Sequence, residues 1–351
     1  MKQWKELLLS PDDTVQCALE LLDKAGSQFA MVLDEYGRLL GVLTDGNIRR
    51  GLLNQIGLGQ VVRCVMEKDA ITVSPEVRAE KALAIMEEKG ILYLPVVDER
   101  GRVLSLWSYR FFHGHTPLDT PVVLMAGGRG VRLGELTKNC PKPMLTVGSK
   151  PILEHTVFTL HSQGFRNFYI TLNYRGQMIE DHFGDGSKFG ISITYLKENK
   201  PLGTAGALSM LPNDLGSSFI VMNGDILTRC NFRLLSAQHA VSGAAATMVT
   251  KLHQVQIPYG VVNSSKDGSL CSVDEKPMLS YAVSAGINVF SPSALPFVPK
   301  DTFFDAPQLV MAIKNADLPV KVYPIDDYWL DIGRVDDYRK ANSEFDVYFE
   351  N

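Results

Sequence analysis

The spacing of apolar and polar residues divides the chain into two regions with different predicted structures. Within residues 10–113, stretches with apolar residues at helical spacing are followed by apolar runs that an Asp-x-x-Gly segment interrupts. This order predicts a helix and then a β-hairpin. From Pro121 onward, apolar runs of strand length alternate with helical stretches. We therefore expect an α/β fold there, with a mainly parallel sheet and helices on both faces.

The first region contains one unit twice. Residues 10–49 align with residues 74–113 without a gap at an offset of 64, and the matched pairs are Pro11 with Pro75, Gly26 with Gly90, Asp34 with Asp98, and Gly37 with Gly101. One such unit has too little core to bury an apolar face by itself. We therefore predict an α+β pair in residues 1–116 and a second domain in residues 117–351, joined by the polar stretch 113–121.

Composition and charge narrow the functional classes. The 351 residues are 45% hydrophobic and 21% charged, as in an ordinary soluble globular protein, and the formal net charge is −4. No basic block points to nucleic acid or to an anionic membrane surface. The N-terminus is too polar for a signal peptide, and no apolar run has transmembrane length. The five cysteines are scattered singly, which predicts reduced thiols in a cytoplasmic protein.

The predicted strand at residues 122–126 leads into a segment suited to phosphate binding. It is followed by Gly-Gly-Arg-Gly at residues 127–130, and glycines let backbone N–H groups approach a phosphate closely. Arg132 and Lys142 come next, and prolines on both sides restrict the backbone at Lys142. The spacing fits neither a dinucleotide-binding fingerprint nor a Walker A loop. Two cations beside such a loop suit a nucleoside triphosphate.

Two carboxylates follow later apolar runs. Asp225 ends the run FIVMNGD, and Asp331 lies in YWLDIG. Ligands of such sheets gather at the carboxyl ends of strands. A carboxylate there can hold Mg²⁺, which needs few protein ligands beside phosphates and water. The alternative for Asp225 is a role in a turn or a helix cap.

The motif G-G-x-G-x-R-L followed by P-K-P resembles the signature of the sugar-1-phosphate nucleotidyltransferases, also called nucleotide-sugar pyrophosphorylases, and the resemblance extends to about residue 342. It implies a Rossmann-like nucleotidyltransferase sheet, with Arg132 and Lys142 on the triphosphate and with Asp225 and Asp331 around one Mg²⁺. Val131 stands where the family usually has Thr or Ser. The nucleotide-binding residues that the resemblance implies are Ala126, Gly127, Gly128, Gly130, Leu202, Gly203 and Thr204.

The same resemblance implies a sugar side of the site. In the segment Glu-Lys-Pro at residues 275–277, Glu275 would accept sugar hydroxyls and Lys276 would contact the sugar phosphate as a catalytic cation. Gly260 would allow a sugar ring to approach closely, and Asn288 would bond to a hydroxyl. Without the resemblance, Glu275 and Lys276 would be interpreted as a solvated pair.

The segment GVLTDGNIRR in the first unit resembles the last strand and helix of CBS domains, which sense adenine nucleotides. The resemblance implies that Thr44 and Asp45 hold a ribose. The matching pair in the second unit is Ser108-Tyr109, which lacks the carboxylate, so we expect at most one nucleotide per chain. The alternatives are that Asp45 only caps its helix and that the pair has a structural or dimerising role.

These features predict the reaction. A phosphate oxygen of a sugar 1-phosphate would attack the α-phosphorus of the triphosphate, giving an NDP-sugar and pyrophosphate. Because its second pKa is about 6, the attacking phosphate is already largely dianionic at neutral pH and needs no general base. Glu198 followed by PLGTAGAL resembles guanylyltransferases of the GDP-mannose type more than thymidylyl enzymes. A CBS pair ahead of this domain resembles the bacterial glucosamine-1-phosphate guanylyltransferases of legionaminic acid synthesis. We therefore expect GTP, glucosamine 1-phosphate or another hexose 1-phosphate, a role in surface glycan or nonulosonic acid synthesis, and a homo-oligomer.

Other functions remain open at this level. UTP or dTTP could replace GTP, and a non-catalytic nucleotide-sensing subunit would share the fold. A glycosyltransferase would have a similar sheet but needs a D-x-D metal motif, whereas this strand ends in Asn223-Gly224-Asp225.

Overall fold

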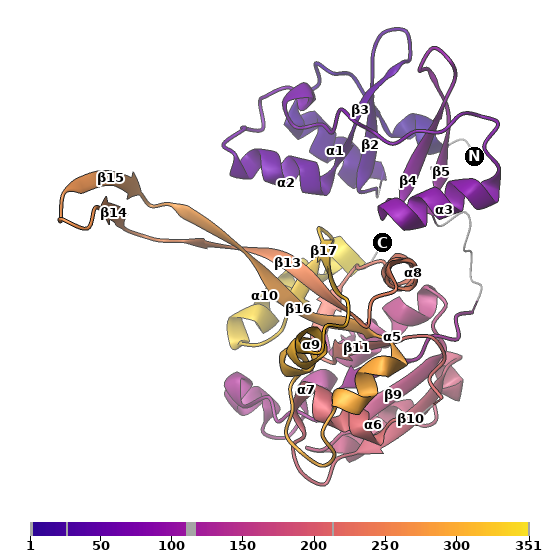
Figure 1. The fold of residues 1–351 in the computed structure, drawn as a ribbon, viewed down its shortest axis with the longest axis vertical. Helices are drawn as coiled ribbons and strands as arrows, with labels where there is room; N and C mark the ends of the chain where they lie inside the picture. The colour runs from indigo at the N-terminus through magenta and orange to yellow at the C-terminus, as the bar shows by residue number, and fades with distance from the viewer. Residues whose placement is uncertain (1–2, 26, 110–116, 213, 350–351) are drawn as a thin grey trace.

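The computed structural model describes residues 3–25, 27–109, 117–212 and 214–349. An N-terminal part, indigo to purple in Figure 1, lies on one side of a larger C-terminal domain. The predicted linker 113–121 and the predicted boundary between residues 116 and 117 fall partly or wholly outside the described residues.

The N-terminal part repeats its elements at the predicted offset. The first unit opens with η1 (Gln3–Glu6) and β1 (Leu8–Leu9), and continues with α1 (Val15–Ala25), β2 (Phe29–Leu33), β3 (Leu39–Thr44) and α2 (Asp45–Leu53). After η2 (Val62–Cys64), the second unit has α3 (Ala79–Lys89), β4 (Tyr93–Val97) and β5 (Val103–Ser108). Each of these three elements starts 64 residues after its counterpart, which confirms the repeat. The counterpart of α2 would begin at Tyr109 and extend outside the described residues.

The two units contact each other through matching positions. Phe29 stacks on Tyr93 with ring centroids 4.6 Å apart. The backbones of Arg38 and Arg102 form an isolated antiparallel β-bridge. Each hairpin turns at a glycine with positive φ, and the N–H of Leu39 donates to the carbonyl of Gly101 at 2.9 Å. Because equivalent residues meet, the units are related by an approximate two-fold axis, as the apolar faces of two incomplete units require.

The C-terminal domain is built on a seven-stranded sheet. Its spatial order is β10 (Ser192–Lys197), β9 (Asn167–Leu172), β6 (Val122–Met125), β11 (Phe219–Asn223), β16 (Met278–Phe290), β13 (Ala246–Gln256) and β17 (Val320–Ile325). The first four strands are mutually parallel, β13 and β17 are parallel to each other, and β16 runs against both of its neighbours. The prediction of a mainly parallel sheet is confirmed.

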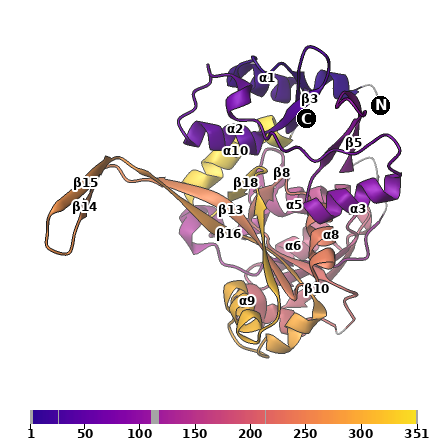
Figure 2. The ribbon, with the colours of Figure 1, turned by 45° about the horizontal axis from the view of Figure 1, so that its top comes forward.

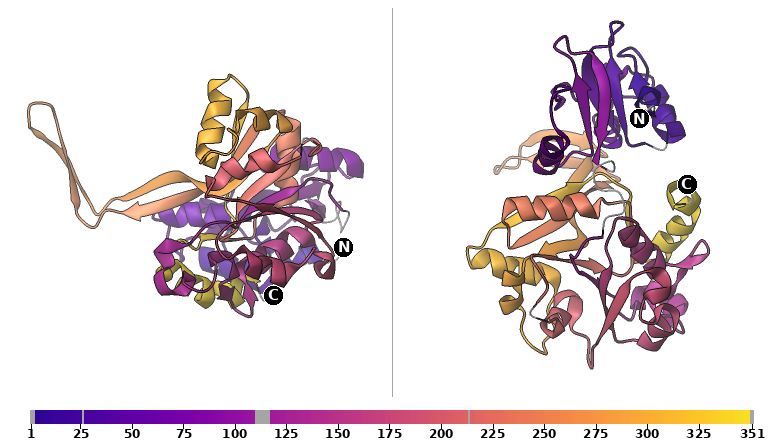
Figure 3. Two further views of the ribbon diagram at one scale, coloured as in Figure 1. Left: turned by 90° about the horizontal axis from the view of Figure 1, so that it is seen from below. Right: turned by 90° about the vertical axis from the view of Figure 1, so that its right-hand side faces the viewer.

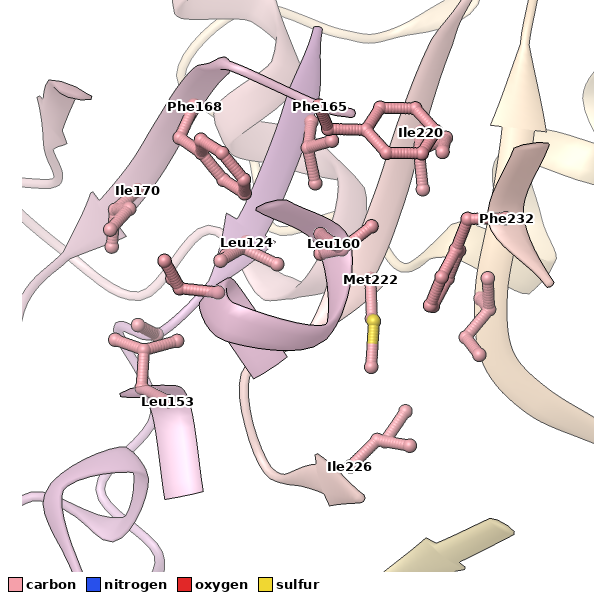
Figure 4. Close-up of a cluster of buried hydrophobic side chains, with 14 of the residues drawn as sticks. Leu124, Leu153, Leu160, Phe165, Phe168, Ile170, Ile220, Met222, Ile226 and Phe232 are labelled. Carbon is pink, nitrogen blue, oxygen red and sulfur yellow. The ribbon is translucent and has the colours of Figure 1, made fainter. Parts of the chain in front are cut away.

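Helices cover both faces of this sheet, as predicted. Figure 4 shows one face, where Leu124, Ile170 and Ile220 of the strands pack against Leu153, Leu160 and Phe232 of helices. That layer consists of α5 (Ile152–Ser162), α6 (Gly176–Phe183) and α8 (Phe232–Ser242). The opposite layer consists of α7 (Gly203–Gly206), η6 (Ala207–Met210), η7 (Pro292–Phe297) and α9 (Ala306–Asn315). Alternate strand residues such as Leu124 and Val123 therefore serve opposite cores.

Smaller elements flank the sheet. They are η3 (Val131–Thr137), η4 (Lys142–Met144), β7 (Thr146–Val147), β8 (Lys150–Pro151), η5 (Ser187–Phe189), β12 (Ile226–Thr228), β18 (Trp329–Asp331) and the last helix α10 (Val335–Phe349). Within the described residues, no helix combines the length and the apolar character that crossing a membrane would require.

A two-stranded arm leaves the sheet. Strands β13 and β16 pair with each other beyond the edge of the sheet. Between them in the chain, β14 (Gly260–Ser264) and β15 (Leu270–Glu275) pair with each other and continue the ribbon. Figures 1 and 3 show this arm extending away from the rest of the molecule. We define residues 252–281 as the arm.

Among the described residues, helices α3 and α2 of the N-terminal part both contact the C-terminal domain. Leu234 of α8 belongs to the same buried cluster as Ala82 and Met86 of α3, and Figure 2 shows these two helices side by side. In addition, Arg50 of α2 pairs with Asp326, which follows β17, at 3.1 Å.

Candidate active site

The glycine loop follows β6 and is shaped by close neighbours. The N–H of Ala126 donates to the hydroxyl of Thr171 at 3.0 Å, which fixes the start of the loop. A Cβ on Gly127 would lie 2.9 Å from Oε1 of Glu198, and a Cβ on Gly130 would lie 2.9 Å from Cβ of Lys142. Gly130 also has φ of +61°, which favours glycine. A Cβ on Gly128 would have no atom within 4 Å, so packing does not require a glycine at this position.

Lys142 is a buried cation beside this loop. Its side chain is only 9% exposed, and its Nζ donates to Oδ2 of Asp225. The distance from the same Nζ to Oδ1 of Asp331 is 3.8 Å. Pro141 precedes it in extended conformation and Pro143 follows, so the ammonium group is held in place at a carboxylate pair.

Two short strands bring Asp225 and Asp331 together. Strands β12 and β18 pair antiparallel with Ile226 opposite Asp331, and the N–H of Ile332 donates to the carbonyl of Asp225 at 3.1 Å. Residues more than one hundred positions apart thus place their carboxylates side by side. Burial raises the pKa of Asp331, and the neighbouring charge of Asp225 raises it further.

The two carboxylates fit the requirements of Mg²⁺. Within the described part of the chain, Oδ1 of Asp225 and Oδ1 of Asp331 are buried and have no hydrogen-bond partner. Buried carboxylate oxygens without partners are costly unless something binds them. Mg²⁺ uses one or two protein carboxylates and takes its remaining ligands from phosphates and water. Asp225 and Asp331 are therefore the residues that would hold the ion.

Arg132 lies at the rim of this cluster. It is exposed on η3, and its Nη1 would be 3.8 Å from a Cβ placed on Gly333, two residues after Asp331. Its charge also lowers the pKa of Asp331, against the larger effect of burial. The structure therefore brings Arg132, Lys142, Asp225 and Asp331 into one place, at the end of β6 and β11.

The loop 202–204 is tied to the glycine loop through Glu198. Oε2 of Glu198 accepts from the N–H of Leu202 at 3.0 Å, and its Oε1 faces Gly127. Thr204 donates its N–H and its hydroxyl to Oδ1 of Asp305, at 2.9 and 3.1 Å. The Thr204 hydroxyl is thus part of the scaffold that anchors the loop to α9.

Sequence reasoning did not select Asp305. Its only local signal is a helix-start pattern, because Asp305 forms a capping box with Gln308 at the start of α9. Its second role, in holding Thr204, depends on a contact about a hundred residues away and has no sequence signature.

Three of the four residues implied for sugar binding lie on the arm, and the fourth lies in the central sheet. Gly260, Glu275 and Lys276 are on the arm, exposed to solvent, and Lys276 pairs only loosely with Glu275 at 4.0 Å. Asn288 is buried in β16 opposite Val221, and its Oδ1 has no partner within the described residues. In this conformation the structure does not bring Glu275 or Lys276 to the cluster of Asp225 and Asp331.

A cavity of about 350 Å³ lies between the N-terminal part and the C-terminal domain. Thr44 and Asp45 line it from one side, and Tyr323, Asp326 and Asp327 line it from the other. Thr44, rather than Asp45, caps α2, because its hydroxyl accepts from the N–H of Asn47 at 3.2 Å. The interpretation of Asp45 as the helix cap is therefore wrong.

Asp326 occupies the start of α2 in this cavity. Its carboxylate pairs with Arg49 and Arg50, and it lies so close to Gly46 that a Cβ there would overlap it. The N-terminus of a helix favours an anion. A side chain of the C-terminal domain thus fills the anion position of the N-terminal pocket, which sequence reasoning did not foresee.

Comparison with known proteins defines the class. Residues 121–346 match the Nucleotidyl transferase family, and residues 4–54 and 62–110 match the CBS domain. Because the first match spans well over half of the chain, this protein belongs to the nucleotidyl transferase family, and its N-terminal part is a tandem pair of CBS domains.

Individual relatives narrow the comparison. The chain is 30% identical over 238 residues to a UTP–glucose-1-phosphate uridylyltransferase of Synechocystis sp., covering 62% of this chain and 61% of that protein. It is 31% identical over 228 residues to the catalytic subunit beta of a mannose-1-phosphate guanylyltransferase of Drosophila pseudoobscura pseudoobscura, covering 62% of this chain and 60% of that one. The chain thus spans less than two thirds of the curated relatives that it matches.

A solved structure shows the same likeness. The crystal structures of HddC from Yersinia pseudotuberculosis, one of them complexed with GMP-PN, match this chain with a TM-score of 0.51. They are 26% and 25% identical to it, and the match covers 64% of this chain and 99% of HddC. The resemblance to sugar-1-phosphate nucleotidyltransferases is confirmed at the level of the family.

Proposed function

We propose that this protein transfers the nucleoside monophosphate unit of an NTP to a sugar 1-phosphate and releases pyrophosphate. The observation that carries the proposal is the cluster of Lys142, Asp225 and Asp331 beside a glycine loop, in which one buried oxygen of each carboxylate has no hydrogen-bond partner among the described residues. The relatives named for uridylyl and guanylyl transfer to sugar 1-phosphates support the same reaction.

The reaction is a displacement at phosphorus. An oxygen of the sugar phosphate forms a bond to the α-phosphorus, and the bond from that phosphorus to the oxygen bridging to the β-phosphate breaks. The bond electrons leave with pyrophosphate. The attacking phosphate is already largely dianionic at neutral pH, so positioning and charge neutralisation supply most of the rate.

The residues of the cluster have separate tasks in this proposal. The loop from Ala126 to Gly130 presents backbone N–H groups to the triphosphate, and the 202–204 loop flanks the base. Lys142 and Arg132 neutralise charge on the phosphates. Asp225 and Asp331 would hold a Mg²⁺ ion, which supplies further charge neutralisation when bound.

The nucleotide and sugar belong to the same proposal. We favour GTP, because Glu198 with PLGTAGAL resembles the guanylyl enzymes, and because relatives include a guanylyltransferase and HddC in complex with GMP-PN. For the acceptor we favour glucosamine 1-phosphate or another hexose 1-phosphate, in the synthesis of surface glycans such as those with legionaminic acid. UTP or dTTP is the alternative, which the uridylyl relative supports.

One assay tests all of these choices. Pyrophosphate release is measured with GTP, UTP, dTTP and ATP against glucosamine, glucose and mannose 1-phosphates, with and without Mg²⁺. We expect release with GTP and glucosamine 1-phosphate or another hexose 1-phosphate, dependent on Mg²⁺, and release with UTP or dTTP instead would support the alternative. Absence of release in every combination would contradict the proposed reaction.

The CBS pair has a proposed ligand of its own. We infer that an adenine nucleotide binds the cavity at Thr44 and Asp45, with its ribose on Asp45 and its phosphate toward the start of α2. The wall formed by Tyr323, Asp326 and Asp327 supports a link to the C-terminal domain. Calorimetric titration of the full chain with AMP, ADP, ATP and GTP, repeated with Asp45→Ala, tests this site. Equal binding by the variant would exclude it.

A further inference from the structure

The segment that carries Arg132 has little structure of its own to hold it in place. Residues 131–139 are mostly exposed, and among them Leu133 and Thr137 alone are buried. The 3₁₀ turns of η3 are interrupted at Gly134, whose φ of +56° and ψ of −123° are not helical. Such turns have poor hydrogen-bond geometry, and an exposed segment with few buried contacts opens at a low free-energy cost. Contacts from outside the segment therefore decide its shape.

Tyr174 contacts both ends of the loop that contains this segment. Its N–H approaches the carbonyl of Gly127 at 3.5 Å. Its hydroxyl donates to the carbonyl of Lys138 at 2.8 Å and lies 3.2 Å from the carbonyl of Thr137. Tyr174 comes two residues after β9, which pairs in parallel with β6, the strand that leads into the glycine loop. One residue at the end of a neighbouring strand thus brackets the loop of residues 127–138.

The contact with Thr137 extends to the glycine loop itself. The hydroxyl of Thr137 donates to the carbonyl of Gly130 at 2.9 Å and lies 3.2 Å from the carbonyl of Gly134. A Cβ placed on Gly130 would lie 3.0 Å from the methyl group of Thr137 and 2.9 Å from Cβ of Lys142. Gly130 is therefore enclosed between Thr137 and Lys142, and a shift of Thr137 would move the glycine loop.

Arg175 directs the hydroxyl of Tyr174 toward the loop. Its Nε donates to the phenol oxygen at 3.1 Å, and its Nη2 donates to Oδ1 of Asn139 at 3.2 Å. A phenol has one proton to donate, so a donor on its oxygen leaves that proton for the carbonyls of the loop. Arg175 has φ of +50°, a conformation that costs energy for a residue with a side chain. Such strain persists where surrounding contacts fix the residue.

We propose that Tyr174 is a positioning residue, whose hydroxyl holds residues 127–138 in the shape that binds the triphosphate before the ligand arrives. Arg175 orients that hydroxyl. The inference rests on the proposed function, since the ligand is the same NTP. Donors that are already in place need no ordering when the ligand binds. Without the Tyr174 hydroxyl, the NTP has to order the loop, and its apparent affinity falls.

Kinetics of Tyr174→Phe, which removes the hydroxyl and keeps the ring, test this role. We expect the KM for GTP to rise about three- to tenfold, the effect of one lost hydrogen bond. The KM for the sugar 1-phosphate should stay unchanged. A smaller folded fraction would instead lower kcat and leave both KM values as they are. Tyr195→Phe is the matched control, because the hydroxyl of Tyr195 donates to the carbonyl of Gly184 at 2.7 Å, outside this loop.

Hydrogen exchange of the protein without ligand gives a second measurement. Amides of residues 127–139 should exchange faster in Tyr174→Phe and in Arg175→Gly, which removes the guanidinium at a position where glycine is free of strain. Unchanged exchange in Tyr174→Phe would overturn the inference, and so would faster exchange with an unchanged KM for GTP. A wild-type protein that releases no pyrophosphate would contradict the proposed function instead, and hydrogen exchange alone would then decide whether Tyr174 holds the loop.

Discussion

Lys142 is the residue on which the cluster depends most. It is buried between Asp225 and Asp331, and its neighbours leave it little freedom. We predict that Lys142→Ala lowers turnover by about 10²–10³-fold, the usual cost of removing one group that stabilises charge in a transition state. Lys138→Ala, in an exposed pair with Glu135, is the matched control and should keep its turnover. Pyrophosphate release measures both, and circular dichroism establishes that both are folded.

Replacing Gly130 tests whether the loop depends on its backbone conformation, because glycine contributes no side chain. Its positive φ and the 2.9 Å approach to Cβ of Lys142 make a side chain unfavourable. We predict that Gly130→Ala lowers the free energy of unfolding by about 1–2 kcal/mol and lowers turnover by displacing Lys142. Gly128→Ala, where no atom lies within 4 Å, should retain its stability. Urea unfolding of the two variants would contradict this account if both lost stability equally.

At the scale of elements, the segment from Asp326 to Asp331 joins two sites. It begins at the CBS cavity, where Asp326 pairs with Arg49 and Arg50, and it ends in β18 at the candidate metal ligand Asp331. A ligand shifts the position of such a segment only if it binds one arrangement of the segment more tightly than another. A nucleotide whose phosphate displaces Asp326 from the start of α2 would bind more tightly to the arrangement in which Asp326 has moved away.

We predict that Asp326→Ala strengthens nucleotide binding at the CBS pair. Removing a competing carboxylate from the start of α2 frees an anion site worth about 1 kcal/mol, which corresponds to about fivefold in affinity. Calorimetry of the full chain with AMP and ATP measures the change. Asp336→Ala, on the exposed side of α10, is the control. A weaker binding by Asp326→Ala would show that this carboxylate supports the ligand rather than competing with it.

Asp327 gives the same interface a dependence on pH. Burial raises the pKa of Asp327 to about 6, from 3.8. Its protonated form is therefore favoured in the folded state, so its contribution to stability is present below about pH 4 and is lost as pH rises through 6. Burial lowers the pKa of Lys251 to about 8, so this lysine stays protonated over that window.

The prediction concerns Asp327→Asn, which cannot ionise. Relative to that of the wild type, its free energy of unfolding should increase between pH 4.5 and pH 7, because only the wild type loses stability over this range. Urea unfolding at both pH values measures the difference. A constant difference would show that the Asp327 carboxylate does not titrate in this range.

At the scale of the whole molecule, the question is whether the C-terminal domain functions without the CBS pair. Its sheet and both helical layers lie within residues 121–346. We predict that a chain lacking residues 1–115 keeps its turnover but is less stable, because Leu234, 2% exposed, loses its cover from α3. Burial of a leucine is worth about 1.5–3 kcal/mol. Thermal unfolding and pyrophosphate release measure both effects, and an inactive truncation would show that the CBS pair is needed for assembly.

Much of the architecture could be predicted because it has a local cause. The repeat at offset 64 follows from the spacing of turn residues such as Asp34 and Gly37, whose hydrogen bonds lie within five residues. The parallel sheet follows from the alternation of strand and helix periods. Likewise, Lys142 and Asp225 could be selected because each follows a recognisable strand or turn.

Three features were decided only by the tertiary structure. Asp225 meets Asp331 through the pairing of β12 with β18, Asp326 enters the CBS cavity through the docking of two domains, and Lys276 leaves its own cluster on the arm. Each depends on contacts between residues that are far apart in the chain. Such contacts are set by the packing of whole elements, and a local pattern of apolar and polar residues carries no record of them. The sequence by itself determined the elements and the chemical groups, and the packing decided which of those groups meet.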